Sequence, residues 1–308
     1  MKHSFVKNIV FPVVAAMIWG TAFVAQSVGA EHVPPFTFNV ARSVVAVVAL
    51  TVILLIWKAI KRHRGNTEKS SDGMKALIIG GICSGTVMCT ATTLQQIGLG
   101  ETDAGKASFI TAMYLVLVPI LGLFLRRRTS AMTAVSVVVS VVGLYLLCVS
   151  DSFTVQGSDV YLLICAFCFA IHILVIDYFA PRTDSIALSL VQFIVMTVES
   201  AVLAAIFEQP TVEGIIAALG QILYVGIFSS GVAYTLQILA QKGSDPTVVT
   251  LLLSLESVFG AIAGALILHE VMSGREYLGC ALMLCAVMLS QIPAEVWKKL
   301  FKNPVDKI

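Results

Sequence analysis

Long apolar runs separated by short polar breaks dominate the sequence. A helix of about 20 apolar residues spans the hydrocarbon core of a bilayer, which is ~30 Å thick. With 58% of its 308 residues hydrophobic and 12% charged, the chain must be surrounded mostly by lipid. We therefore predict an all-α integral membrane protein with ten transmembrane helices, at residues 9–28, 36–57, 74–97, 104–125, 131–149, 159–179, 186–208, 214–240, 246–268 and 276–292.

The basic residues predict which side of the membrane each break faces, because Lys and Arg concentrate in cytoplasmic loops. If the N-terminus is cytoplasmic, only Lys106 and Arg275 of the 20 Lys and Arg residues fall outside, and Arg42 lies within a span. This asymmetry predicts that both termini are cytoplasmic, and it supports ten spans independently of hydropathy. The first apolar run is interpreted as a span and not as a cleavable signal peptide.

Two helical hairpins, residues 93–128 and 234–270, follow the same plan. Sliding one onto the other by ~142 positions brings polar residues and glycines into register, as expected of an internal repeat. The aligned pairs are Gln95 with Gln237, Asp103 with Asp245, Gly122 with Gly264, and Tyr114 with Glu256.

Five helices in each half is an odd number, so the second half must be inverted relative to the first. We expect two inverted five-helix repeats, residues 1–150 and 151–293, followed by a basic cytoplasmic tail, residues 294–308. Inverted repeats are typical of secondary transporters, whose binding site lies near the midplane between the halves.

Four motifs, in order along the chain, are similar to those of the drug/metabolite transporter superfamily, EamA type. They are IWGTAFV at 18–24, PFTFNVAR at 35–42, ASFIT at 107–111 with Val118-Pro119, and LSLESVF at 253–259. The resemblance covers nearly the whole chain and implies a multi-pass carrier of the bacterial inner membrane, commonly an exporter of amino acids or other metabolites. Two positions depart from the family pattern: Arg127 stands where an acidic residue is common, and Ser257 replaces a proline.

Polar and aromatic side chains inside the spans are the candidates for substrate binding, namely Trp19, Arg42, Gln95, Tyr114, His172, Gln192, Tyr234, Gln237 and Glu256. Charges at this depth are costly unless they are paired or hydrated. Arg42 is interpreted either as a structural residue that snorkels or caps neighbouring carbonyls, or as a functional residue that clamps a substrate carboxylate or pairs with Glu101 or Asp103. Trp19 either packs or stacks on substrate, and a lone His172 is typical of a packing residue.

Glu256 and Glu199 are the candidates for coupling transport to protons, since burial favours the neutral form of a carboxylate. For both residues, structural pairing is the alternative. Asp177 is expected to be hydrated near the cytoplasmic face.

Three further features bear on the packing of the helices. Gly80-x-x-x-Ser84 and Gly226-x-x-x-Ser230 predict close helix contacts. Pro119 predicts a kink in the fourth span. Residues 58–75 are expected to form a solvated loop.

The function predicted from these features is secondary transport of small amphipathic compounds by alternating access. The alternatives are a lipid-modifying membrane enzyme and a channel or sensor without a transport cycle. An enzyme would need a cluster of His, Asp or Ser at one interface, whereas the five histidines are scattered. We expect no cofactor, no metal and, at a net charge of +2, no nucleic-acid partner. The sequence leaves open whether the carrier acts as a homodimer.

Overall fold

The computed structural model describes residues 5–63, 72–101, 104–127, 129–148, 156–267 and 272–291. Every regular element in these residues is a helix. In chain order the elements are η1 (Val6–Val10), α2 (Phe11–Ala30), α3 (Pro35–His63), α4 (Asp72–Glu101), α5 (Ala104–Thr111), α6 (Tyr114–Phe124), α7 (Ala131–Cys148), α8 (Gly157–Phe179), η2 (Ala180–Arg182), α9 (Ser185–Phe207), α10 (Val212–Ala217), α11 (Leu219–Tyr224), η3 (Val225–Ala233), α12 (Tyr234–Gln241), α13 (Pro246–Leu253), α14 (Glu256–Ile267) and α15 (Gly274–Ser290).

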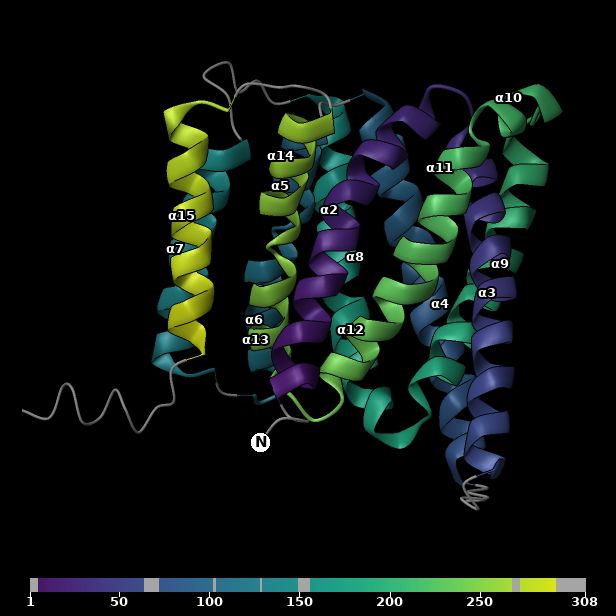
Figure 1. Ribbon diagram of the computed structural model, residues 1–308, viewed down its shortest axis with the longest axis horizontal. Coiled ribbons are helices and arrows are strands. Elements are labelled where there is room, and N and C mark those ends of the chain that lie inside the picture. The colour runs from purple at the N-terminus through teal and green to yellow at the C-terminus, as the bar shows by residue number, and fades with distance from the viewer. Residues whose placement is uncertain are drawn as a thin grey trace, which may run out of the picture.

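These elements make ten membrane-crossing segments, as predicted. Nine of the segments in the described residues are long and apolar enough to cross a membrane, and the tenth, α15, has 17 residues. We call the side where α2 begins and α15 ends the terminal face, and the other side the opposite face (Figure 1). The loop expected at residues 58–75 is shorter than predicted, because α3 continues to His63 and α4 begins at Asp72. The predicted tail, residues 294–308, and the boundary at residue 150 lie outside the described residues.

The two halves are inverted repeats, and the contacts between helices of different halves occur in equivalent pairs. The third segment, α4, packs on α8, and the equivalent eighth segment packs on α2. Segments that are equivalent to each other also pair directly, α3 with α9 and α7 with α15. Figure 1 shows these two pairs at opposite ends of the bundle, with the remaining segments between them.

Small residues allow the backbones to approach closely at these contacts. A methyl group on Gly80 would lie 2.7 Å from Phe179 Cγ, and one on Gly226 would lie 2.8 Å from the Arg42 carbonyl oxygen. Both glycines of the predicted Gly-x-x-x-Ser contacts are therefore packing residues. A methyl group on Gly143 would lie 2.8 Å from the Gly279 carbonyl, which explains how α7 and α15 pair.

The fourth and ninth segments are each broken near the middle of the membrane. The first break separates α5 from α6 at Ala112–Met113, and the second separates α13 from α14 at residues 254–255. The breaks occupy equivalent positions in the two halves, and only the first precedes a proline, Pro119. Pro119 lies within α6, so the interruption is about one and a half turns before the site of the predicted kink.

The equivalent third and eighth segments differ in helix type. The eighth segment contains the π-helix η3, whereas the equivalent third segment is α-helical from Asp72 to Glu101. A π-helical turn widens the helix and is frequent at functional sites.

Candidate functional site: a cavity between the two halves

A cavity lies at the centre of the bundle, with about 500 Å³ of empty space when the part open to its surroundings is counted. Its walls come from both halves, since α2, α3, α4, α5 and α6 face α8, η3, α12, α13 and α14. The lining residues are Trp19, Phe23, Gln26, Arg42, Gln95, Thr111, Tyr114, Phe169, Ile173, Ser229, Tyr234, Gln237, Leu253 and Glu256. Seven of the nine candidate residues from the sequence are in this set.

The two broken segments bring a tyrosine and a carboxylate together in the cavity wall. Tyr114 is the first residue of α6 and Glu256 is the first residue of α14. The Tyr114 hydroxyl donates a 2.9 Å hydrogen bond to Glu256 Oε1. Glu256 is 4% exposed, and a negative side chain at the N-terminus of a helix interacts favourably with the helix dipole. The hydroxyl and the helix dipole both stabilise the carboxylate form of Glu256.

Arg42 supplies the positive charge of the cavity. Its side chain is 2% exposed, and its Nη1 donates a 2.9 Å hydrogen bond to Gln26 Oε1. The expected snorkelling and the expected pairing with Glu101 are therefore wrong for this structure, because the guanidinium points into the protein and bonds to an amide. Asp103, the other expected partner, lies outside the described residues. A buried guanidinium bonded to a neutral amide keeps donors for a further acceptor.

Aromatic rings form one wall of the cavity. The Trp19 and Tyr234 rings lie 4.7 Å apart between centroids, and Trp19 Nε1 donates a 3.3 Å hydrogen bond to the Ser229 carbonyl in η3. The Tyr114 and Phe169 rings lie 6.5 Å apart in an edge-to-face arrangement. Such rings offer apolar faces to a ligand while their polar edges stay bonded. Trp19 and Glu256 thus share one cavity, as expected from their depth.

The remaining candidate residues lie outside the cavity. His172 Nε2 and Gln192 Oε1 are 3.2 Å apart in the packed layer behind it, where the His172 ring contacts the Tyr234 ring. Glu199 faces a separate groove between α4 and α9, where it accepts a 2.5 Å hydrogen bond from Thr86 Oγ1. Of the two candidates for proton coupling, only Glu256 therefore lies in the cavity.

Sequence reasoning missed several lining residues that helical spacing could have identified. Phe23 and Gln26 follow Trp19 by four and seven residues, so the three share one face of α2. Thr111, three residues before Tyr114, and Leu253, three before Glu256, follow the same rule across the two breaks. A spacing of three, four or seven residues from a candidate residue in the same membrane-crossing segment was the available signal.

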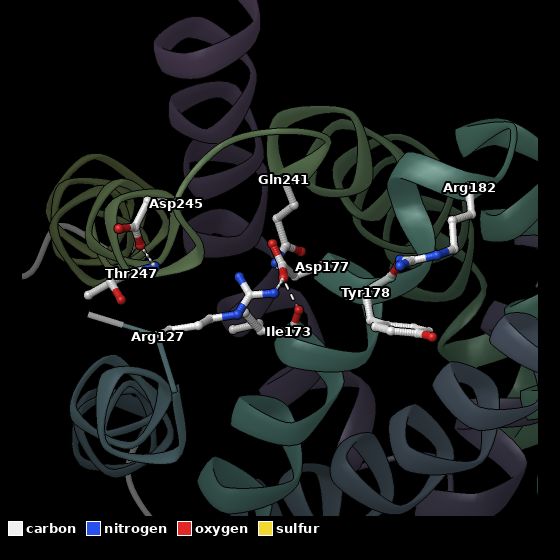
Figure 2. Close-up of polar contacts among 8 residues, drawn as sticks. All are labelled: Arg127, Ile173, Asp177, Tyr178, Arg182, Gln241, Asp245 and Thr247. Carbon is white, nitrogen blue, oxygen red and sulfur yellow. Dashed lines mark hydrogen bonds and ion pairs between the residues drawn. The ribbon is translucent and has the colours of Figure 1, made fainter. Parts of the chain in front are cut away.

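Polar contacts between the halves close the terminal face beneath the cavity. Arg127, just after the end of α6, forms an ion pair with Asp177 near the end of α8 (Figure 2). The pair crosses from one half to the other. Beside it, within the second half, Gln241 Nε2 donates a 2.9 Å hydrogen bond to the Ile173 carbonyl. Ser244 Oγ lies 3.2 Å from Asn8 Oδ1, which joins the halves a second time.

The geometry of Asp177 corrects the expectation that water hydrates it. Asp177 is only 8% exposed, because Arg127 covers its carboxylate. Arg126 has a left-handed backbone conformation, with φ of 59°, and turns the chain just after the end of α6. The Arg127 amide then donates a hydrogen bond to the Gly122 carbonyl, which is typical of a helix C-terminus. An acidic residue at position 127, which is common in the family that the sequence resembles, would repel Asp177.

On the opposite face an ion pair also joins the halves. Lys106 Nζ of α5 lies 2.7 Å from Asp159 Oδ2 of α8. Glu208, which follows α9, accepts hydrogen bonds of 2.8 and 2.7 Å from the Phe36 and Thr37 amides at the start of α3. The described contacts therefore link the halves at both faces.

Both halves of the chain match one family of membrane proteins. Residues 6–149 and, separately, 156–291 match the EamA-like transporter family. The chain belongs to this family. An uncharacterized transporter of Archaeoglobus fulgidus is 27% identical over 275 residues, covering 89% of this EamA-family chain and 82% of the relative. The chain is therefore a multi-pass membrane transporter, as predicted.

Two further relatives and one solved structure are also similar to this EamA-family transporter. The uncharacterized transporter YoaV of Bacillus subtilis is 22% identical, over 89% of this chain and 93% of the relative. The WAT1-related protein At3g02690, chloroplastic, of Arabidopsis thaliana is 26% identical, over 89% of this chain and 67% of the relative. A solved crystal structure at 16% identity superimposes with a TM-score of 0.76 over 96% of this chain and 99% of that one, which shows a shared fold.

Proposed function

We propose that this transporter exports small amphipathic zwitterions, such as amino acids, by alternating access of the central cavity. The observation that carries the proposal is that one buried cation and one buried carboxylate, Arg42 and Glu256, line the same cavity together with aromatic rings. A substrate carboxylate would bind the guanidinium of Arg42, and a substrate ammonium would bind Glu256. The apolar part would pack on the rings of Trp19 and Tyr234.

The transport cycle would move one half relative to the other. The Arg127–Asp177 pair would hold the terminal face closed while the cavity opens to the opposite face, and the Lys106–Asp159 pair would close that face in turn. Glu256 would couple this movement to protons. Burial favours the neutral carboxylic acid in the occluded cavity and opposes the effect of the Tyr114 hydroxyl and the helix dipole, so Glu256 would lose its proton when water or a substrate cation reaches it.

The proposed location is the cytoplasmic membrane of a bacterium, with both termini in the cytoplasm and the halves divided at residues 150 and 151. The distribution of Lys and Arg supports this orientation. A cysteine at Arg182 on the terminal face should react with a membrane-impermeant maleimide only after cells are opened. A cysteine at Gln209 on the opposite face should react in intact cells, and the reverse pattern would contradict the orientation.

Counterflow in proteoliposomes tests the substrate class. Vesicles loaded with unlabelled leucine should take up labelled leucine with saturation, and other apolar amino acids should compete. 3-Methylbutylamine, which lacks the carboxylate, and 4-methylpentanoate, which lacks the ammonium group, should compete roughly tenfold less well, since each loses one charged contact. Equal competition by all three compounds would contradict the zwitterion proposal, and flux without saturation or counterflow would indicate a channel.

The role of Arg42 has its own test in the same assay. Arg42→Gln should remove the preference for leucine over 3-methylbutylamine while leaving the preference over 4-methylpentanoate. Profiling of metabolites in the medium of cells with and without the protein would then test the direction of transport, since an exporter enriches its substrate outside.

A further inference from the structure

A second hollow lies apart from the central cavity, on the side of the molecule where α4 and α9 face lipid. It has about 1020 Å³ of empty space when its open side is counted, and it shares no lining residue with the cavity. Its walls are Phe36 of α3, five residues of α4 and four of α9, namely Cys89, Thr90, Thr93, Leu94, Ile97, Val198, Glu199, Val202 and Leu203.

The packing of α4 on α9 explains where this groove begins. Towards the terminal face the two helices touch, since a methyl group on Gly81 would lie 2.2 Å from Val191 Cγ1 and one on Gly85 would lie 2.7 Å from Val195 Cβ. From Cys89 onward α4 carries larger side chains, and the groove extends from there towards Phe36 at the opposite face. It is therefore closed at mid-depth and open along its side.

A carboxylate at this depth requires a partner. Glu199 is 14 residues into α9, roughly 20 Å along a helix that is about 35 Å long, so its short side chain does not reach the interface. The Thr86 hydroxyl donates one hydrogen bond to Glu199 Oε1. None of the lining residues is Lys, Arg or His, and a charge within the membrane is costly without a counter-ion.

We propose that this groove binds a lipophilic amine that enters from the bilayer, with Glu199 accepting hydrogen bonds from its ammonium group and the apolar walls holding its aliphatic chain. Charge complementarity selects this occupant, because Glu199 is the one charged side chain among the lining residues and the others are apolar apart from Thr90 and Thr93. Without the open space, the groove has a volume of about 570 Å³, which is in the range of ligand pockets. Asn39, which bonds through Nδ2 to Thr93 Oγ1 at 3.1 Å, lies between the groove and the Arg42 wall of the cavity. The site is independent of the proposed zwitterion transport.

Photolabelling of the full-length protein in phosphatidylcholine nanodiscs tests this site. The probe is dodecylamine with a diazirine at the end of its chain, and the reference probe is the corresponding dodecanol. The amine should label the peptides that contain residues 90–97 and 198–203. Glu199→Gln should lower this labelling roughly tenfold, as expected for a lost hydrogen bond to a charged group, while labelling by the alcohol should change less than about twofold.

Two variants complete the test. Glu213→Gln removes an exposed carboxylate on α10 and should leave the labelling unchanged. Val202→Trp keeps Glu199 but fills the groove, and it should lower labelling by both probes. Amine labelling that survives Glu199→Gln would overturn the proposal, since the groove would then accept any aliphatic chain. Protection of these peptides in nanodiscs that hold two copies of the protein would also overturn it, in favour of a contact between copies.

Discussion

Tyr114 and Glu256 are 142 residues apart and occupy equivalent positions in the two halves, yet they are joined by a 2.9 Å hydrogen bond. Equivalent residues of an inverted repeat can touch only near the axis that relates the two halves. The pair therefore marks that axis, and it lies where both broken segments resume as helices. One half contributes a tyrosine at this position and the other half contributes a glutamate, so the two walls of the cavity differ chemically near the axis.

Removing the hydroxyl of this pair should impair transport. Tyr114→Phe leaves the ring in place but deprives Glu256 of its donor, and a hydrogen bond to a charged group contributes about 1.5–3 kcal/mol. We expect leucine counterflow to fall roughly tenfold or more. Tyr161→Phe, on the lipid-facing side of α8, is the matched control and should retain normal counterflow.

Replacing the carboxylate separates coupling from exchange. Under proton coupling, a pH gradient alone should concentrate leucine in vesicles that contain the unaltered protein, and Glu256→Gln should abolish this accumulation while sparing leucine–leucine exchange. Accumulation that persists in the variant would show that Glu256 is not the coupling residue.

The contact between α2 and α14 should tolerate no added methyl group. A methyl group on Gly20 would lie 2.5 Å from the Glu256 carbonyl and 2.6 Å from the Gly260 amide, both of them backbone atoms. Gly20→Ala should therefore destabilise the protein by about 1–3 kcal/mol and lower its thermal midpoint in detergent. Gly220→Ala, where nothing lies within 4 Å of the added methyl group, should leave the midpoint unchanged or raise it.

The ion pair on the terminal face should control access to the cavity. Arg127→Asp places like charges side by side, so a cysteine introduced at Leu253 should react faster with a maleimide applied from the terminal face. Adding Asp177→Arg reverses the pair and should restore slow labelling. If the double variant labels as fast as Arg127→Asp alone, the two charges do not act as a pair.

Much of the fold follows from the sequence because lipid imposes strict rules on it. The spans of about 20 apolar residues, the bias of Lys and Arg, and the odd number of helices in each half together predict ten helices in an inverted repeat. The breaks at Ala112–Met113 and at Ser254 with Leu255 were not predicted. No glycine or proline lies at either break, so composition alone gives no signal.

The sequence predicted how deep the candidate residues lie in the membrane, but it did not predict which way their side chains point. Trp19, Arg42 and Glu256 lie deep within their spans, and all three face the cavity. Glu199 lies equally deep in its span, yet its side chain points away from the cavity and into the separate groove. Sequence analysis could not predict this, because hydropathy does not reveal which face of a helix meets lipid. The bond between Arg42 and Gln26 joins two helices, and no local pattern predicts such a contact.

The π-helix η3 lies in the eighth segment, whereas the equivalent third segment is α-helical from Asp72 to Glu101. The two segments therefore differ in backbone geometry where η3 contributes Ser229 to the cavity wall. Exchanging the conformations of the two halves would not reproduce the same structure. Under the proposed alternating access, the two open states of the empty carrier would consequently differ in free energy.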